Sequence, residues 1–320
     1  MKQEAILTSG PHLGTKQAPE RQVLLQKRSA GRVLKDAIEK IMNALFFACG
    51  MAAVACVLLI TVYIFSAGLP AIRQIGLSDF LLGRVWKSTA AEPSYGILPF
   101  ILTSVYGTVG ACVIGVPVGV LTAVFLSKMA PPRLAAVVSA AVELLAGIPS
   151  VVYGLIGMLV LVPAVADVFR LSSGACLLAA ILVLAVMILP SMISVAVTAL
   201  NAVPPEYEQA SLALGATPVE TYFKVSLTAA RSGIAAGIVL GIGRAVGEAM
   251  AVMMVAGNVA NMPGIFTSVT FLTTAIAKEM SYASGLQRQA LFSIGLALFL
   301  FIMAINAVLN LVLKGGRDDD

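Results

Sequence analysis

Two residues of opposite charge, Arg244 and Glu248, lie four positions apart inside an otherwise apolar run, residues 233–257. In a continuous α-helix they would share one face with Gly237 and Gly241, and small residues on that face would let another helix approach closely. A charged side chain at the centre of a bilayer costs roughly 2.5–3.5 kcal/mol on insertion scales. A chain keeps such a pair where it faces water, a partner or a substrate, so we expect a charged or polar solute to cross here.

A third ionisable residue at membrane depth, Glu143, lies in an earlier apolar segment that Pro149 is expected to bend or unwind. One arrangement places Arg244 between Glu248 and Glu143. A guanidinium presents a planar fork of N–H donors that matches an oxyanion such as phosphate. Nearby carboxylates would keep the anion from being trapped, because conduction requires release as well as binding. These three residues form the candidate substrate path, and the alternative is an ion pair that only locks two helices together.

Other kinds of chemistry lack the residues that they need. The four cysteines all lie in apolar stretches without a CxxC pair, and the only histidine, His12, lies in the polar N-terminal tail. Neither a Ser-His-Asp triad nor a histidine-based metal site is therefore expected. No P-loop motif occurs, so we expect no ATP site, no cofactor and no metal. Glu143 with Glu248 could resemble the paired carboxylates of a membrane enzyme, but no nucleophile or metal set accompanies them.

Composition places the chain in a membrane. Hydrophobic residues make up 59% of it and charged residues 12%, and the mean hydropathy is +0.96. A soluble domain carries about 45–50% apolar and about 25% charged residues. A span needs about 20 consecutive apolar residues to cross the hydrocarbon layer. The sequence therefore predicts an all-α membrane protein with six transmembrane helices, at residues 42–67, 97–126, 134–163, 175–200, 233–257 and 291–313.

The distribution of Lys and Arg orients these spans. With the N-terminus in the cytoplasm, fourteen of the 21 basic residues lie on the inner side and six in the outer loops, which favours two cytoplasmic termini. The chain then divides into a basic tail (1–40), a six-helix domain (41–315) and an acidic tail (316–320). The net charge of +5 does not indicate nucleic acid, because the basic residues gather beside a membrane segment, where they touch anionic lipid. In the outer loop 68–96, Trp86 suits headgroup depth as an anchor or as part of a docking surface.

The loop between the fourth and fifth spans, residues 201–232, is longer than a membrane connector needs to be. Two prolines end the fourth span, and the acidic residues after them open a short helix that Gly215 is placed to end. A second short helix begins at Pro218 and runs to about residue 227. We expect a compact helix–turn–helix on the cytoplasmic side, which a partner protein grips.

This loop resembles the EAA loop of ABC importer permeases, on the stretch Gln-Ala-Ser-Leu-Ala-Leu-Gly-Ala at 209–216, followed by Val-Ser-Leu at 225–227. In that family the loop forms a coupling helix that sits in a cleft of the ATPase subunit. The resemblance implies ATPase coupling through four residues, Glu208, Gln209, Ala210 and Gly215. The chain departs from the family pattern twice, since Gln209 replaces its glutamate and Thr228 its proline.

Three further stretches resemble the phosphate-specific ABC permeases of the PstC type: Val-Glu-Leu-Leu-Ala-Gly-Ile-Pro-Ser-Val-Val-Tyr-Gly at 142–154, the run around Arg-Ala-Val-Gly-Glu within 240–258, and 277–285. The resemblance covers most of the six-helix domain and implies the type I, MetI-like permease fold with a cytoplasmic coupling-helix loop. The family also treats the residues that match Arg244 and Glu248 as functionally important.

The resemblance implies a permease subunit of an ATP-driven importer of inorganic phosphate, in the plasma (inner) membrane of a prokaryote. It would form half of the translocation path beside a second, PstA-like permease, with two ATPase subunits below and an extracytoplasmic phosphate-binding protein above. Two alternatives stay open. One is an ABC permease for another oxyanion, such as sulfate, molybdate or phosphonate. The other is a stand-alone secondary transporter or channel, which would need no ATPase and would commonly show inverted repeats.

Overall fold

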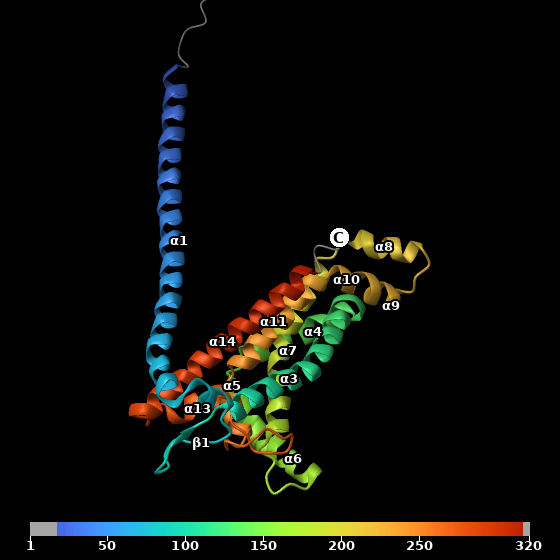
Figure 1. Cartoon of the computed structure of the whole chain (residues 1–320). Coiled ribbons are helices and arrows are strands. Elements are labelled where there is room, and N and C mark those ends of the chain that lie inside the picture. Colours follow the sequence, from blue (N-terminus) through green and yellow to red (C-terminus); the bar gives the residue numbers. More distant parts are fainter. Residues whose placement is uncertain (1–17, 316–320) are drawn as a thin grey trace, which may run out of the picture. The chain divides into compact units, whose positions relative to one another are not determined.

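The computed structural model describes residues 18–315, with side chains for residues 35–307, and most of this part is helical (Figure 1). The chain forms two compact units that divide between Val62 and Tyr63. The described part of the first unit is helix α1 (Ala18–Ile75), which continues into the second unit. Every side chain from residue 35 to residue 60 is exposed, although most are apolar, as expected for a helix that meets lipid or a partner.

The predicted basic and acidic tails stay predictions. His12 and the acidic C-terminal tail lie outside the described residues. The division of the chain at residue 40 stays a prediction, because α1 runs through this point without interruption.

The second unit contains the remaining elements, in which η marks a π-helical segment. Its first half consists of α2 (Leu77–Leu82), β1 (Trp86–Lys87), β2 (Ser94–Tyr95), α3 (Leu98–Val124), η1 (Phe125–Met129), α4 (Pro132–Gly147), α5 (Ser150–Ile156), η2 (Gly157–Leu161) and α6 (Val162–Phe169). Its second half consists of α7 (Leu177–Asn201), α8 (Pro205–Ala213), α9 (Pro218–Thr221), η3 (Tyr222–Ser226), α10 (Leu227–Ala229), α11 (Arg231–Gly247), α12 (Met250–Val255), α13 (Leu272–Glu279) and α14 (Gly285–Gly315).

Prolines begin several of these helices. Pro99, Pro132, Pro205 and Pro218 stand in the first turns of α3, α4, α8 and α9. The missing N–H of proline has no helical partner to lose there, and its fixed φ suits the first turn. The prolines therefore mark helix starts, as predicted for the two short helices after α7.

Five helices of the described chain are long and apolar enough to cross a membrane, and a bent pair makes a sixth. They are Lys35–Ile75, Leu98–Met129, Ser150–Phe169, Leu177–Asn201 and Gly285–Ala307, with Pro218–Ala229 and Arg231–Gly247 as the pair. The predicted all-α membrane class is confirmed, as are the places of four of the six predicted segments. The other two segments, 134–163 and 233–257, are each interrupted.

The predicted segment 134–163 is wrong as a single helix. α4 ends at Gly147, Ile148 and Pro149 are extended, and a new helix begins at Ser150. Proline lacks the N–H that would continue a helix, and it disfavours helical backbone in the residue before it. The bend expected at Pro149 is therefore a complete break.

The predicted segment 233–257 is also wrong as a single helix. α11 ends at Gly247, Glu248 has extended backbone (φ −73°, ψ 130°), and α12 begins at Met250. At its other end, α11 follows a sharp turn, since the bent pair meets at 72°. Two spans are thus replaced by broken helices.

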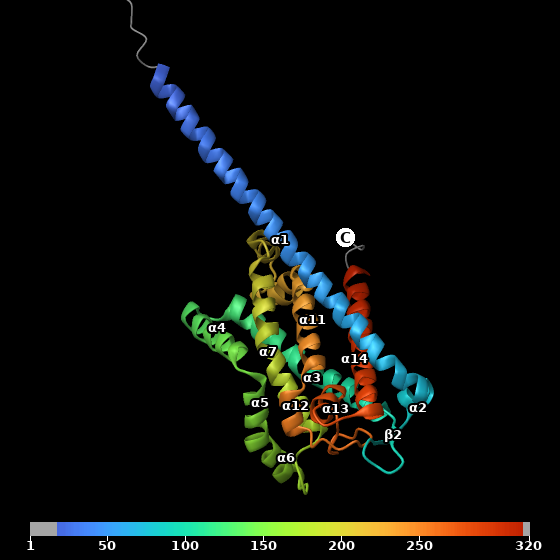
Figure 2. The ribbon, with the colours of Figure 1, turned by 90° about the vertical axis from the view of Figure 1, so that its left-hand side faces the viewer.

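The core of the second unit forms around α7. This span is 56% buried, whereas the other four continuous spans are 33% buried or less. A helix that is apolar on all sides belongs in an interior, and Leu184, Met187 and Ile188 of α7 are almost completely buried. Helices α3 and α11 run beside it (Figures 1 and 2).

The second unit has two distinct ends: α8, α9 and α10 gather at one, and the β1–β2 hairpin, α6 and α13 at the other (Figures 1 and 2). At the second end the Glu279 carboxylate of α13 accepts hydrogen bonds from Trp86 Nε1 (3.1 Å), Ser88 Oγ (2.8 Å) and Gln287 Nε2 (3.1 Å). The Trp86 ring is only 8% exposed and packs edge-on against Tyr95. The headgroup anchor predicted for Trp86 is wrong, because this indole belongs to the core.

Candidate functional site

Arg244 lies in the last turn of α11, close to the helix break. Its side chain is partly buried, between the buried residues Ala245 and Val246 along the chain and the exposed Gly243. Its positive charge acts on the hydroxyl of Tyr153 in the first turns of α5. Among the described side chains no carboxylate forms an ion pair with it. Within the part of the chain that the structure describes, Arg244 is therefore a partly buried cation without an ion-pair partner.

Glu248 stands in the break and not on the helix that carries Arg244. Its Oε1 accepts a hydrogen bond from the Ala251 N–H (2.9 Å), in the first turn of α12. A carboxylate is favourable there, because the first N–H groups of a helix lack partners and carry partial positive charge. Its backbone oxygen accepts from Thr273 Oγ1 of α13 (2.7 Å). The predicted face shared by Arg244 and Glu248 in one continuous helix is wrong, because Glu248 caps the next helix instead.

Glu143 lies on α4, on the other side of the break at Pro149. Its side chain is exposed, whereas its neighbour Val142 is buried in a cluster with Leu126 and Ile193. The arrangement with Arg244 between Glu248 and Glu143 is not formed as ion pairs in the described part of the chain. Whether Glu143 belongs to a substrate path stays a prediction.

The two helix breaks are neighbours in space, because α5 and α12 pack against each other. A Cβ added at Gly154 would lie 2.8 Å from the Ala251 Cα, so the two backbones are in close contact. The Tyr153 hydroxyl donates to the Leu145 carbonyl oxygen (2.7 Å), which ties α5 to α4 across the break. Irregular backbone at membrane depth is tolerated where it is buried in protein or lines a polar cavity, and transporters build their binding sites from such broken helices.

A second candidate site lies at the other end, on α8. Glu208 Oε1 receives Lys128 Nζ of η1 at 2.6 Å and Ser226 Oγ of η3 at 2.7 Å. The Lys128 and Glu208 side chains are only 12% and 19% exposed. Glu208, one of the residues predicted to couple the chain to an ATPase, thus makes contacts inside the chain. Lys128 and Ser226 gave no local signal in the sequence, since they lie in two different segments.

The electrostatics of Glu208 favour its ionised form. Burial by itself raises the pKa of its carboxyl, but the hydrogen bonds from Lys128 and Ser226 and the charge of Lys128 together lower the pKa below its ordinary value of 4.5. A carboxyl with a lowered folded-state pKa stabilises the fold fully above the unfolded-state value, and this stabilisation is lost as the pH falls through the folded-state pKa. The Glu208 carboxyl that faces Lys128 is therefore ionised at neutral pH.

The other predicted coupling residues lie on the surface. Gln209 and Ala210 are exposed. Gly215 has φ +88°, and its N–H donates to the Leu212 carbonyl oxygen (3.0 Å), so it ends α8 in the left-handed conformation that glycine adopts without strain. Leu214 beside it is 90% exposed. Large apolar side chains that are exposed on a polar part of a surface mark an interaction site. α8, the turn after it and α9 expose four of them, Tyr207, Leu212, Leu214 and Val219, which we call the α8 apolar patch.

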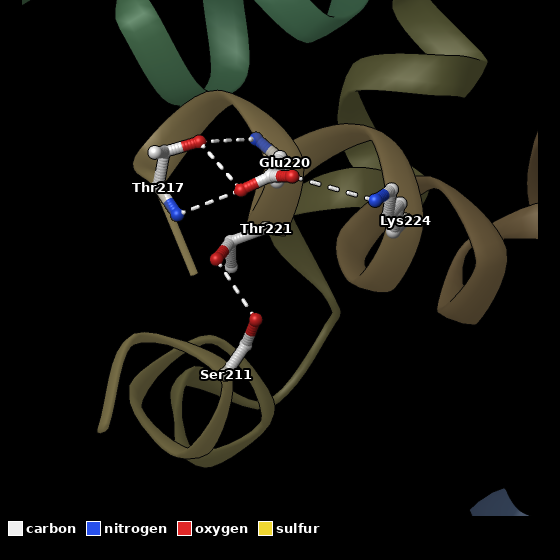
Figure 3. A network of polar contacts seen from close by, with 5 residues as sticks. All are labelled: Ser211, Thr217, Glu220, Thr221 and Lys224. Atoms are coloured by element: carbon white, nitrogen blue, oxygen red, sulfur yellow. Dashed lines mark hydrogen bonds and ion pairs between the residues drawn. The ribbon is translucent and has the colours of Figure 1, made fainter. Parts of the chain in front are cut away.

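Polar contacts hold α8 and α9 together (Figure 3). The hydroxyls of Ser211 in α8 and Thr221 in α9 share a hydrogen bond of 2.9 Å. Thr217 and Glu220 form a reciprocal capping box at the start of α9, which satisfies two N–H groups that have no helical partner. Lys224 reaches Glu220 at 3.4 Å, one turn further on. The predicted helix–turn–helix is therefore an ordered unit that presents the α8 apolar patch.

Comparisons with known proteins agree on one class. Residues 115–315 match the family model described as "Binding-protein-dependent transport system inner membrane component". The chain is 39% identical over 267 residues to the Bacillus subtilis protein named "Probable ABC transporter permease protein YqgH", which covers 81% of this chain and 86% of that one. It is 36% identical over 255 residues to the phosphate transport system permease protein PstC of Pasteurella multocida, with 73% and 79% covered.

The fold has a counterpart among solved structures. A chain of the MetNI methionine ABC transporter, in an inward-facing conformation, superposes with a TM-score of 0.52 at 23% sequence identity. The match covers 69% of this chain and 94% of that one. The similarity is one of fold.

Proposed function

The chain belongs to the family of binding-protein-dependent transport system inner membrane components, and on that premise we propose that it is the permease subunit of an ATP-driven importer of inorganic phosphate. One observation carries the choice of phosphate. Relatives from several organisms that are named as phosphate transport system permease proteins PstC are 30–36% identical to this chain over most of their length.

The proposed path for the anion runs past Arg244. The guanidinium is partly buried, lies beside two adjacent helix breaks and has no ion-pair partner among the described residues. An unneutralised Arg favours an oxyanion, because its planar fork replaces part of the water lost by the anion. Glu248 lies close by in sequence with its carboxylate turned to α12, so it limits the positive potential without occupying the guanidinium. Glu143 contributes a carboxylate to the path from the exposed side of α4, where it can meet a second permease or the solute.

The proposed partners are those that membership of the family implies. We assign ATP hydrolysis to two separate ATPase subunits, because the chain has no P-loop motif. A second, PstA-like permease completes the path, and an extracytoplasmic phosphate-binding protein delivers the anion at the end that carries the β1–β2 hairpin and α13. The protein then lies in the inner membrane, and the end that carries α8 faces the cytoplasm, as do both termini.

The α8 apolar patch is the proposed contact with an ATPase subunit. Leu214 is 90% exposed at the tip of an ordered turn, and a leucine in that position gains about 1.5–3 kcal/mol when a partner removes it from water. Gln209, in the position of the family glutamate, is exposed on the same helix. The patch therefore supplies the apolar contact, and Gln209 supplies a neutral polar contact.

The test is transport by the reconstituted complex. Proteoliposomes are prepared with the chain, its partner permease and the ATPase subunits. The phosphate-binding protein is added either inside or outside the vesicles. The measurement is ATP-dependent uptake of radiolabelled phosphate. We expect Arg244→Gln to lower uptake about tenfold or more while the complex still assembles, since a hydrogen bond to a charged group contributes about 1.5–3 kcal/mol. Arg133→Gln, at an exposed arginine of α4, is the control and keeps full uptake.

Three results would contradict the proposal. Normal uptake by assembled Arg244→Gln would remove Arg244 from the path. Uptake of sulfate, molybdate or a phosphonate in preference to phosphate would assign the importer to another oxyanion. Phosphate uptake without any ATPase subunit would instead identify a secondary transporter.

A further inference from the structure

Three separate segments of the chain meet at the carboxylate of Glu208. Glu208 belongs to α8, Lys128 to the π-helical end of the span that begins with α3, and Ser226 to the π-helical segment between α9 and α10. One oxygen, Oε1, accepts from both side chains, at 2.6 Å and 2.7 Å. We call these three residues the Glu208 junction.

A neighbouring contact strengthens the same connection. Ser127 Oγ donates to Asn201 Oδ1 (2.5 Å), so η1 also holds the last residue of α7. The connector 202–204 between α7 and α8 is therefore fastened to η1 on both sides, by Asn201 before it and by Glu208 after it. A connector held in this way cannot act as a free hinge.

The local backbone explains how Lys128 and Ser226 reach one carboxylate. π-Helical turns are rare, usually occur as single turns within α-helices, and are frequent at functional sites. Both donors lie within such turns, η1 and η3, at the ends of elements that continue into membrane spans. The wider turn redirects side chains relative to a regular α-helix, and here both redirected side chains end at α8.

The surface of α8 separates two tasks. Gln209, Ala210 and Leu214 are exposed and free to meet a partner, whereas Oε1 of Glu208 is engaged by two contacts inside the chain. A polar contact between charged groups is shorter and stronger than a neutral one, and it is screened less when it is mostly buried. The contacts of Glu208 Oε1 therefore serve to hold α8.

We infer that Glu208, with Lys128 and Ser226, is a positioning residue that makes α8 move as one body with the ends of α3 and α11, so that a displacement of α8 by the ATPase reaches the spans. The inference rests on the proposed function for the displacement itself. The new element is that a single carboxylate passes the displacement of α8 to two helices. Lys128 connects it to α3, and Ser226 connects it to α11, which carries Arg244. Without the junction, the connector 202–204 and the turn at Gly215 would absorb the movement.

The test compares Glu208→Gln and Lys128→Met, which remove one charge each, with the exchanged pair Lys128→Glu/Glu208→Lys. Glu206→Gln is the matched control, because Glu206 is an exposed carboxylate of the same helix. Two quantities are measured in the assembled complex: hydrogen–deuterium exchange of the amides of α8, and the number of phosphate ions transported for each ATP hydrolysed.

Each single variant should speed exchange in α8 by about tenfold, as expected when a local contact that opposes opening is lost. It should also lower the ratio of phosphate to ATP several-fold, while ATP hydrolysis continues. The exchanged pair should restore both quantities at least in part, which a general loss of folding would not allow, and Glu206→Gln should match the parent.

Unchanged exchange and an unchanged ratio in Glu208→Gln and Lys128→Met would overturn the inference. The exchange measurement needs no substrate, so it can fail or succeed independently of the proposed function. Failure of the parent complex to transport phosphate would count against that function alone, and slow exchange in both single variants would count against the junction alone.

Discussion

At the scale of single residues, the ionisable groups differ in how their charge is compensated. Glu208 is compensated inside the chain by Lys128, and Glu248 by the N-terminal turn of α12. Arg244 has no ion pair among the described residues, and its place in the last turn of α11 gives it only the partial negative charge of a helix C-terminus. A buried charge is costly unless something pairs with it, so Arg244, which lacks an ion pair, is the residue that a solute or a partner is expected to meet.

One contact at this scale can be tested by adding a single methyl group. At Gly154 a Cβ would lie 2.8 Å from the Ala251 Cα and 3.0 Å from the Ala251 oxygen, and backbone atoms cannot move away cheaply. Overpacking costs about 1–3 kcal/mol, which outweighs the gain of up to about 1 kcal/mol from replacing Gly by Ala in a helix. We expect Gly154→Ala to lower the Tm of the purified chain by about 2 °C or more, as measured by thermal unfolding in detergent.

The control is Gly147→Ala, because a Cβ at Gly147 meets no atom within 4 Å. This variant should unfold at the parent temperature or slightly above it. If both variants gained stability equally, the close packing of α5 on α12 would be refuted.

At the scale of elements, the interruptions of the helices matter more than their lengths. The chain breaks α4 from α5 at Pro149 and α11 from α12 at Glu248, and the segments behind these breaks pack together. In the described chain, π-helical segments end one helix (η1) and interrupt two others (η2 and η3), and η1 and η3 supply the donors to Glu208. The broken elements thus supply the candidate path and its connection to α8.

The α8 element can be tested for its proposed partner. Leu214→Ser removes an apolar side chain that is 90% exposed and supports nothing inside the chain. We expect the variant to keep its own stability but to retain about a tenth or less of the co-purifying ATPase subunit, because loss of a buried leucine contact costs about 1.5–3 kcal/mol. The readout is the amount of ATPase subunit that co-purifies with the tagged chain.

Leu82→Ser serves as the matched control. Leu82 is 66% exposed in α2, which adjoins the end with the hairpin, so its loss should leave the ATPase bound. Full retention of the ATPase by Leu214→Ser would place the coupling contact elsewhere.

At the scale of the whole molecule, contacts join loops that the charge distribution assigns to the same side. The predicted inner loops 127–133 and 201–232 meet through Lys128 and Glu208. The predicted outer loops 68–96 and 258–290 meet through the Glu279 carboxylate. Each pair of loops lies at one end of the second unit, which is what alternating passage through a bilayer requires.

The orientation can be measured by labelling added cysteines in intact cells with a membrane-impermeant maleimide. Ser281→Cys and Arg133→Cys place thiols at exposed positions of the two ends. By the positive-inside rule we expect label on residue 281 in intact cells, and on residue 133 only after the membrane is permeabilised. The parent chain, with its four native cysteines, gives the background, and labelling in the reverse order would invert the proposed topology.

Local sequence determined a large part of this protein. Runs of apolar residues placed the spans, because hydrophobicity and length alone decide whether a helix can cross a bilayer. Pro205 and Gly215 marked the start and the end of α8, since their backbone limits act within one turn. The same local limits indicated a disturbance at Pro149, and the motif around Arg244 indicated the family.

Tertiary structure alone decided which residues meet. Lys128 and Glu208 are joined although the spans around α5 and α7 lie between them in the sequence, and their contact depends on the packing of α3 on α7 and on the width of a π-helical turn. The same holds for Trp86, whose burial against Tyr95 depends on the hairpin and α13, and for Glu248, which leaves its expected helix to cap α12. Pairing between distant segments is selected by three-dimensional packing and compensation of charge, neither of which a local pattern of residues encodes.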